Sequence, residues 1–293
     1  MLKCDVGDVI NDCREVYYKK EAVVKIQKLL KIVVCAVFIS SITSLSALRF
    51  VVTILSYNNA KWYERNLNSI FSQAFPADQF RVVYIDDCSS DGTGQLVEDY
   101  IERHGYQNRV TLVRNTERKR AMCNMYTAVH DYCADDEIVV SVDGDDWLAH
   151  SQVFKRLAQE YQNPNVWLVY AQYQNWPANT KGFSRPVPPR AYKLKSFRSV
   201  VRTTSQLRSF YAWIFKRIKR EDLMWKGQFF YAACDVAYML PIFEMVAERN
   251  RFIPEILYIY NRATPINDHK VNLEAQMECN KEIRLRPPYA RLP

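Results

Sequence analysis

Three aspartates follow one apolar run at a spacing that suits a divalent cation. The segment IVVSVDGDDWL (residues 138–148) places Asp143, Asp145 and Asp146 directly after a stretch with the composition of a buried strand. Mg²⁺ and Mn²⁺ are held by one or two carboxylates together with phosphate oxygens and water. The pattern therefore indicates a metal-assisted diphosphate site. The alternative is an ordinary turn in which Asp146 caps the next helix.

Two other polar segments also follow apolar runs, ILSYNN (residues 54–59) and YIDDCSSDGT (residues 84–93). Helical patterns over residues 62–73, 94–103 and 119–133 separate the successive apolar runs. Strands that alternate with helices at this spacing predict an α/β domain with a parallel, Rossmann-like sheet and helices on both faces. Ligands of such sheets bind at the carboxyl ends of the strands, which is where these polar segments lie.

These segments, taken in order, resemble the nucleotide-binding half of the family 2 glycosyltransferases. That half has V-x-I-x-x-Y-N, then IDD-x-S-x-D-x-T, an arginine-bearing helix and finally D-x-DD, and the match covers about residues 50–150. The resemblance implies an α/β fold of the GT-A type, with a mostly parallel central sheet. Residues 49–150 would form the nucleotide-sugar half and residues 151–293 the acceptor half. A UDP-sugar is the donor that the resemblance favours.

The resemblance also implies roles for individual residues on the donor side. Asp87 would accept a hydrogen bond from the pyrimidine N3–H, and Arg120 would approach the base or the diphosphate. The other donor-binding residues that it implies are Tyr57 and Asn58 near the base and Asp143 at the ribose. The segment RNTERKRAMCN lacks the glycine that usually follows the asparagine, and its other basic residues, Arg114, Arg118 and Lys119, fit a solvated surface equally well.

The same resemblance assigns the metal and the general base. Asp145 would ligate Mn²⁺ or Mg²⁺, and His269, in a polar loop after the last predicted strand, would join it. A helical pattern runs over residues 236–248, and Asp235 just before it in FFYAACDVAYMLPIFEM would be the base of an inverting transfer. Its alternative is a helix cap, whereas Glu244 on the same predicted helix is expected to be structural.

Aromatic residues of the second half offer a wall for an acceptor sugar, although core packing explains them equally well. They are Trp213 and Trp225. The acceptor would be a hydroxyl of a glycan, a lipid or a protein. Residues 284–293, RLRPPYARLP, are expected to form a surface tail.

Three alternatives to glycosyl transfer remain at this stage. A nucleotidyltransferase of the same fold would need a Gly-rich basic loop that ILSYNN does not supply. A non-catalytic sugar-binding module does not need the Asp143, Asp145 and Asp235 set. The net charge of +8 would suit nucleic acid, but the aromatic and basic interleaving of RNA-binding segments is missing, so no nucleic-acid partner is expected. P-loop and HExxH segments are also missing, which argues against P-loop proteins and zinc metalloproteases of the HExxH type. The absence of a QxxRW segment argues against a processive synthase.

The first 48 residues differ in texture from the rest. Lysines at positions 19, 20, 25, 28 and 31 precede an apolar run over residues 32–48, which is at the short limit for a membrane-spanning helix. The run is either a single N-terminal membrane anchor or an extra helix packed on the domain, with the chain otherwise cytoplasmic. The eight cysteines show no CxxC pair and are expected to be reduced thiols.

Overall fold

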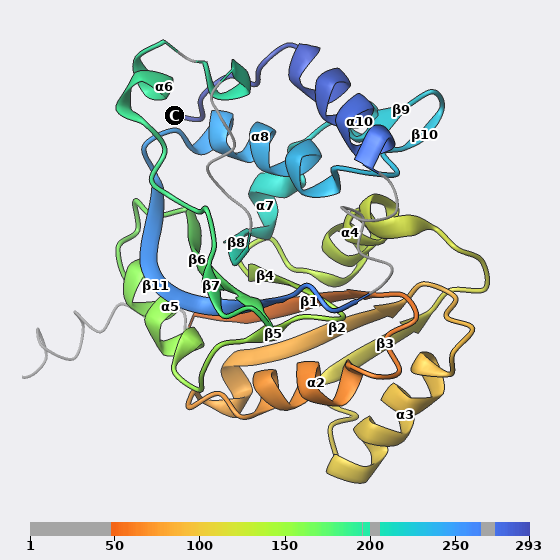
Figure 1. The fold of residues 1–293 in the computed structure, drawn as a ribbon. Helices are drawn as coiled ribbons and strands as arrows, with labels where there is room; N and C mark the ends of the chain where they lie inside the picture. Colours follow the sequence, from red (N-terminus) through yellow and green to blue (C-terminus); the bar gives the residue numbers. More distant parts are fainter. Residues whose placement is uncertain (1–47, 195, 200–205, 265–272) are drawn as a thin grey trace, which may run out of the picture. The chain divides into compact units, whose positions relative to one another are not determined.

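The computed structural model describes residues 48–194, 196–199, 206–264 and 273–293 (Figure 1). The N-terminal segment to residue 47 and His269 lie outside these ranges, so the membrane anchor and the histidine ligand stay predictions. Within the described ranges, no helix has the length and apolar character needed to cross a bilayer. The cysteines there, Cys88, Cys123, Cys133, Cys234 and Cys279, are all free thiols.

The described chain alternates strands and helices in its first half and is less regular in its second. The strands are β1 (Phe50–Ser56), β2 (Phe80–Asp86), β3 (Val110–Arg114), β4 (Ile138–Asp143), β5 (Trp147–Leu148), β6 (Leu168–Trp176), β7 (Thr180–Lys181), β8 (Arg208–Tyr211), β9 (Met224–Trp225), β10 (Gln228–Phe229) and β11 (Asn250–Asn261). The helices are α2 (Tyr63–Phe71), α3 (Thr93–His104), α4 (Arg120–Tyr132), α5 (Val153–Tyr161), α6 (Pro189–Lys193), α7 (Ala212–Phe215), α8 (Cys234–Val246) and α10 (Leu273–Leu285), with short 3-10 turns η1 (Ala77–Gln79), η2 (Phe197–Ser199) and η3 (Arg220–Leu223).

Nine of the described strands form one mixed sheet, in the order β3-β2-β1-β4-β8-β6-β11-β5, with β7 paired to β6. The strands β1 to β4 are parallel, and β8 lies antiparallel between β4 and β6. The predicted α/β fold with a mostly parallel sheet is confirmed. Because Ser56 pairs with Asp86 and Leu55 with Asp143, the carboxyl ends of three strands meet at one edge of the sheet.

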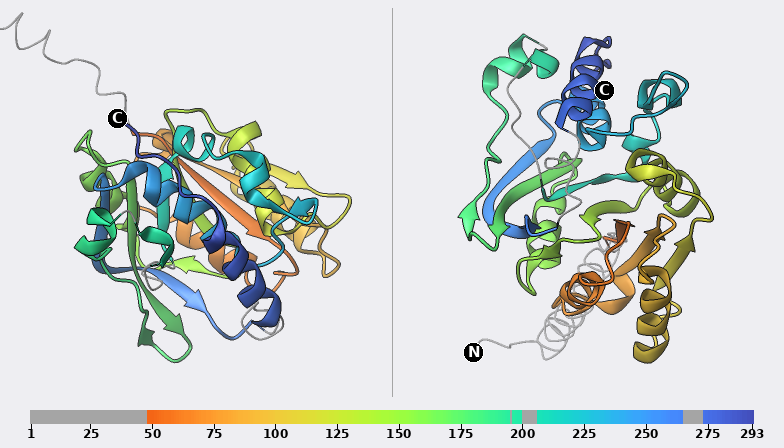
Figure 2. Two further views of the ribbon diagram at one scale, coloured as in Figure 1. Left: turned by 90° about the horizontal axis from the view of Figure 1, so that it is seen from above. Right: turned by 45° about the vertical axis from the view of Figure 1, so that its right-hand side comes forward.

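Helices cover both faces of this sheet (Figures 1 and 2). Within β1, Val51 packs into the core shared with α4, α7, α8 and α10, whereas Phe50, Val52 and Ile54 pack into the core shared with α2, α3 and α5. Both faces of β1 are therefore buried, which is why its sequence is a continuous apolar run rather than an alternating one.

The expected elements of the first half are all present, and those of the second half only in part. The helical pattern over residues 236–248 is α8, and the last expected strand is β11. The strands β6 and β8 and the helix α10 were not predicted. The C-terminal residues lie at the surface as expected, and they are held there because the Tyr289 hydroxyl donates to Asp222 and the Leu292 amide donates to the Met245 carbonyl (2.9 Å).

The turn after β4 is held from two other elements. The Asn66 side chain on α2 donates to the backbone carbonyls of Asp143 (3.0 Å) and Asp146 (2.7 Å). Gly144 passes so close to β1 that an added Cβ would lie 2.7 Å from Ser56 Cβ, so only glycine fits there. The middle residue of Asp-Gly-Asp is therefore required by packing.

Asp146 does not cap a helix, in contrast to the alternative considered for it. It is fully buried, and its carboxylate accepts hydrogen bonds from the Tyr258 hydroxyl (2.7 Å) and the Asn261 amide (2.7 Å), both on β11. The Tyr258 hydroxyl also accepts the Asp143 N–H (3.0 Å). Burial, with the negative charges of Asp145 and Asp143, raises the pKa of Asp146 well above its usual range. The turn is thus bound directly to a strand more than a hundred residues later.

We expect Tyr258→Phe to lower the free energy of unfolding by about 1–3 kcal/mol, because it leaves the partly buried Asp143 N–H and the buried Asp146 carboxylate each short of a partner. Urea unfolding followed by circular dichroism measures this. The control is Tyr106→Phe, since the Tyr106 ring stacks on Phe71 but its hydroxyl makes no hydrogen bond recorded in the described ranges. Equal stability of the two variants would contradict the role given to the Tyr258 hydroxyl.

Candidate active site

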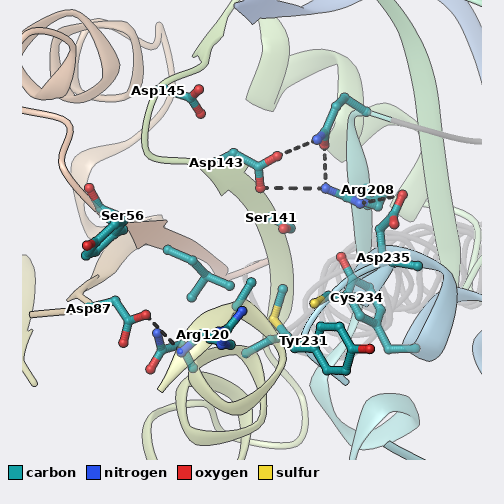
Figure 3. Close-up of a pocket in the computed structure, with 18 of the residues that line it drawn as sticks. Ser56, Asp87, Arg120, Ser141, Asp143, Asp145, Arg208, Tyr231, Cys234 and Asp235 are labelled. Carbon is teal, nitrogen blue, oxygen red and sulfur yellow. Dashed lines mark hydrogen bonds and ion pairs between the residues drawn. The ribbon is translucent and has the colours of Figure 1, made fainter. Parts of the chain in front are cut away.

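A cavity of about 300 Å³ opens at the carboxyl ends of β1, β2 and β4 (Figure 3). Residues far apart in the sequence line it, from the loop after β1 to helix α10. Its charged lining residues are Asp87, Arg118, Arg120, Asp143, Asp145, Arg208 and Asp235. The sequence-predicted residues Tyr57, Asp87, Arg120, Asp143, Asp145 and Asp235 therefore share one cavity.

Asp87 anchors the start of α4 beneath the cavity. Its carboxylate accepts hydrogen bonds from the backbone amides of Lys119 and Arg120 (both 2.8 Å) and from the Asn115 side chain (2.9 Å). Burial works to raise the pKa of Asp87, but the hydrogen bonds from Asn124, Asn115 and the two amides outweigh it, so the pKa lies below its usual value. Asp87 thus stays ionised and fixes the loop that carries Arg118 and Arg120.

The two asparagines after β1 face different ways. The Asn58 side chain accepts the Ser90 N–H (2.9 Å), and Asn58 is not among the residues that line the cavity. Asn59 lines it instead, with its amide group donating to Ser56 Oγ (3.0 Å). The geometry therefore gives Asn58 a role in holding the β2–α3 loop, and its expected contact with the base stays a prediction.

Arg118 and Arg120, at the start of α4, line the cavity, whereas Lys119 and Arg114 do not. The guanidinium of Arg118 lies 3.7 Å from the centre of the Tyr57 ring, a stacked arrangement that orients both side chains. Arg120 takes a left-handed backbone (φ 66°), which a non-glycine residue rarely adopts. Such strain is concentrated at functional sites, and here it is held by the hydrogen bond from the Arg120 amide to Asp87.

Asp143 and Asp145 supply the carboxylates at the end of β4. Asp143 accepts a hydrogen bond from the Gln206 side chain (2.6 Å), and 39% of its side chain is exposed. Partial burial raises the pKa of Asp143, while the nearby Arg208 opposes that shift. Asp145 lies one residue beyond the close-packed Gly144 and also lines the cavity.

Asp235 approaches the cavity from the opposite side, in the first turn of α8. The N-cap of α8 is Ala233, and no side chain caps the helix, so Asp235 is not the cap that was considered for it. Its Oδ2 lies 3.4 Å from Nη1 of Arg208, a side chain on β8 that is 4% exposed. The cavity thus joins carboxylates from both halves of the chain around one buried arginine.

The model of the family described as "Glycosyl transferase family 2" matches residues 51–226, more than half of the chain. The match includes the segments that supply Tyr57, Asp87, Arg120, Asp143 and Asp145. The chain belongs to glycosyl transferase family 2.

Among known proteins, this family 2 glycosyltransferase is similar to the poly(ribitol-phosphate) beta-N-acetylglucosaminyltransferase TarS of Staphylococcus aureus. The two are 35% identical over 102 residues, which is 34% of this chain and 17% of TarS. The chain therefore matches only about a sixth of the length of that curated relative.

Solved structures share its fold at low identity. Staphylococcus aureus TarS 1–349 in complex with UDP-GlcNAc has a TM-score of 0.56 and 18% identity, covering 80% of this chain and 65% of that one. The mannosyltransferase PcManGT from Pyrobaculum calidifontis, in complex with GDP-Man and Mn²⁺, has a TM-score of 0.56 and 22% identity, covering 84% of this chain and 66% of that one. At such identities the likeness shows the fold of the family 2 glycosyltransferase alone.

Sequence reasoning missed Arg208 and Gln206, which connect Asp143 to Asp235 in this family 2 glycosyltransferase. The apolar residues next to Arg208 could have indicated a strand. Arg208 itself lies outside the segments, about residues 50–150, that carry the resemblance to the family. Trp213 and Trp225, offered as an acceptor wall, do not line the cavity: Trp213 packs on Trp167 and Trp225 on Phe230. The aromatic residues that line it are Tyr57, Tyr173, Phe183, Tyr231, Tyr238 and Tyr260.

The donor set fits a metal that completes its coordination with phosphate oxygens. No cluster of three or more His, Cys, Asp or Glu side chains suited to a metal occurs in the part of the chain that the structure describes. Asp143 and Asp145 nevertheless both line the cavity, and Mg²⁺ or Mn²⁺ held by one or two carboxylates with a diphosphate needs no third protein ligand.

We expect Asp87→Asn to destabilise the family 2 glycosyltransferase by about 1–3 kcal/mol at neutral pH, because an amide group would face one of the two backbone N–H donors. Because the pKa of Asp87 is lower in the folded state, the ionised carboxylate stabilises the fold fully at pH values above the unfolded-state pKa, about 3.9. That stabilisation is lost as the pH falls through the folded-state pKa. The difference in melting temperature from wild type should therefore shrink below about pH 4. Asp131→Asn, an exposed position on α4, is the control and should change little. A difference independent of pH would contradict the assignment.

Proposed function

We propose that this chain transfers a sugar from a nucleoside-diphosphate donor, a UDP-sugar, to an acceptor hydroxyl with inversion at the anomeric carbon. The single observation that carries the proposal is the cavity itself. Asp143 and Asp145 line its donor side and Asp235 the other, with all three carboxylates supplied by elements of one continuous sheet and the helix packed on it. Family membership and the neighbours that hold UDP-GlcNAc or GDP-Man support a nucleotide-sugar donor.

The residues of the donor side divide the work of holding a nucleotide diphosphate. Arg118 and Arg120 bring positive charge to the cavity and suit its phosphates, and the Tyr57 ring, stacked on Arg118, offers a flat surface for the base. Asp145, with Asp143 beside it, would hold Mn²⁺ or Mg²⁺, and His269 stays a predicted further ligand. When bound, the cation would offset the negative charge that develops on the departing diphosphate.

Asp235 is placed to act as the general base. Its carboxylate would take the proton of the acceptor hydroxyl while the hydroxyl oxygen forms a bond to the anomeric carbon. The bond from that carbon to the diphosphate oxygen breaks on the opposite face, and the nucleoside diphosphate leaves with the bonding electrons. One displacement by this route inverts the configuration of the sugar.

We expect Asp145→Asn to weaken Mn²⁺-dependent UDP binding by at least about tenfold, because a neutral amide supplies less charge to a hard cation. Isothermal titration of UDP with and without Mn²⁺ measures this. Asp136→Asn, at an exposed aspartate paired with Arg49, is the matched control and should bind as wild type does. Wild-type affinity in the Asp145 variant would reject the metal assignment.

For Asp235→Asn we expect turnover to fall by about 10²–10⁴-fold while UDP affinity stays near wild type, because the donor is held by the other side of the cavity. The assay is nucleotide release with a panel of UDP- and GDP-sugars and candidate acceptors. Glu244→Gln is the control on the same helix. Glu244 pairs with Arg198 (2.7 Å) outside the cavity, so this variant should lose stability and keep its turnover. Unchanged turnover in the Asp235 variant would favour a non-catalytic sugar-binding module.

A further inference from the structure

Arg208 is a buried cation beneath the cavity, and it contacts carboxylates from both of its sides (Figure 3). Its side chain is 4% exposed, with Nη1 3.4 Å from Asp235 Oδ2 and Nη2 3.8 Å from Asp143 Oδ1. A buried guanidinium costs free energy unless it is paired and hydrogen-bonded. Both of its ionic partners line the cavity, so groups of the candidate active site offset much of this cost, although the buried Nε has no hydrogen-bond partner among the described residues.

Further contacts fix the plane of the guanidinium. Nη2 donates to Gln206 Oε1 (2.6 Å), and the Gln206 amide donates to Asp143 Oδ2 (2.6 Å). The centre of the Tyr238 ring, one turn after Asp235 on α8, lies 5.8 Å from Cζ. Burial lowers the pKa of Arg208, but Tyr238, Asp143 and Asp235 outweigh it, so the arginine stays charged. Asp143, Gln206 and Arg208 thus contact one another through Nη2 of the guanidinium. The other terminal nitrogen, Nη1, faces Asp235.

The backbone that carries Arg208 is more firmly held than the one that carries Asp235. Arg208 pairs with Ser141 on β4 and with Tyr170 on β6, so its strand is hydrogen-bonded on both sides. Asp235 instead lies in the first turn of a helix that begins at the left-handed residue Ala233. A general base must hold its carboxylate within a fraction of an ångström of the productive position. The strand β8 therefore holds Arg208 in a fixed position, from which it can orient the Asp235 carboxylate.

The positive charge of Arg208 is a second reason to give it a role at Asp235. Two carboxylates in one partly buried cavity repel each other, and a shared cation reduces that repulsion. A guanidinium is a planar fork that can contact two carboxylates at once, whereas a lysine ammonium is a single point charge. We propose that Arg208 is a positioning residue, which holds the Asp235 carboxylate against the donor-side Asp143 and directs it toward the acceptor hydroxyl. This inference rests on the proposed function, because Arg208 acts through the proposed base and does not touch the reacting atoms.

The test is a double-mutant cycle in the full chain with Arg208→Lys, Asp235→Asn and the double variant. Single-turnover transfer from the donor identified by the panel is measured at saturating donor, together with donor KM. We expect Arg208→Lys to lower the transfer rate by about 10–100-fold with donor KM changed less than about threefold. In the Asp235→Asn background, the same lysine substitution should cost less than about threefold, since the group it positions is gone.

Two outcomes overturn the proposal in different ways. Equal losses from Arg208→Lys in both backgrounds would show that Arg208 does not work through Asp235, even if Asp235 is the base. A rate unaffected by Asp235→Asn alone would reject the base assignment, and with it the role of Arg208.

A matched variant separates positioning from stability. Arg198→Lys changes another largely buried arginine, which pairs with Glu244 at 2.7 Å and is 11% exposed, away from the cavity. It should lower the melting temperature and leave the transfer rate within about twofold of wild type. If it reduces the rate as much as Arg208→Lys does, loss of stability accounts for both, and the proposal fails.

Discussion

The buried carboxylate of Asp146 ties the end of β4 to β11, and the carboxylates of Asp143 and Asp145 take their positions from that link. Tyr258 and Asn261 bind the two oxygens of Asp146, and Asn66 holds the same turn from α2. The side chains of the neighbouring residues Asp143 and Asp145 are consequently presented from a turn that is fixed on three sides. Pre-organised groups of this kind avoid reorganisation when charge develops during a reaction.

Negative and positive side chains lie in different parts of the cavity. Asp143, Asp145 and Asp235 concentrate negative charge toward the β4 end, whereas Arg118 and Arg120 bring positive charge from the start of α4. A divalent cation would offset the negative charge, and a diphosphate would offset the positive charge. A cation together with a diphosphate therefore suits this cavity better than either ion alone. Asp87 supports the positive side by accepting the amides that begin α4, and it also lines the cavity, where its contact with the base stays a prediction.

The antiparallel strand β8 is the structural reason that two halves of the chain form one site. Inserted between β4 and β6, it continues the sheet beyond the parallel strands and places Arg208 and Gln206 beside Asp143. Helix α8 then packs on the face that also carries α4, which brings Asp235 over the same sheet edge. Asp143 and Asp235, which are far apart in the sequence, thereby share one cation, Arg208.

The first half of the fold, and the acidic residues that follow β2 and β4, could be predicted from the amino-acid sequence. Strands buried on both faces are continuous apolar runs, and polar residues directly after them must meet at one sheet edge, so Asp87, Asp143 and Asp145 could be placed from local pattern. Three features could not be predicted without the folded chain: Asn59 rather than Asn58 lines the cavity, Asp146 binds β11, and Arg208 joins Asp143 to Asp235. These facts depend on backbone φ values at single residues and on contacts between residues 27 to more than 100 positions apart, such as Asp146 with Tyr258. Local composition carries no information about such pairs, because the free energy that selects them comes from burying and pairing polar groups that meet only after the sheet has formed.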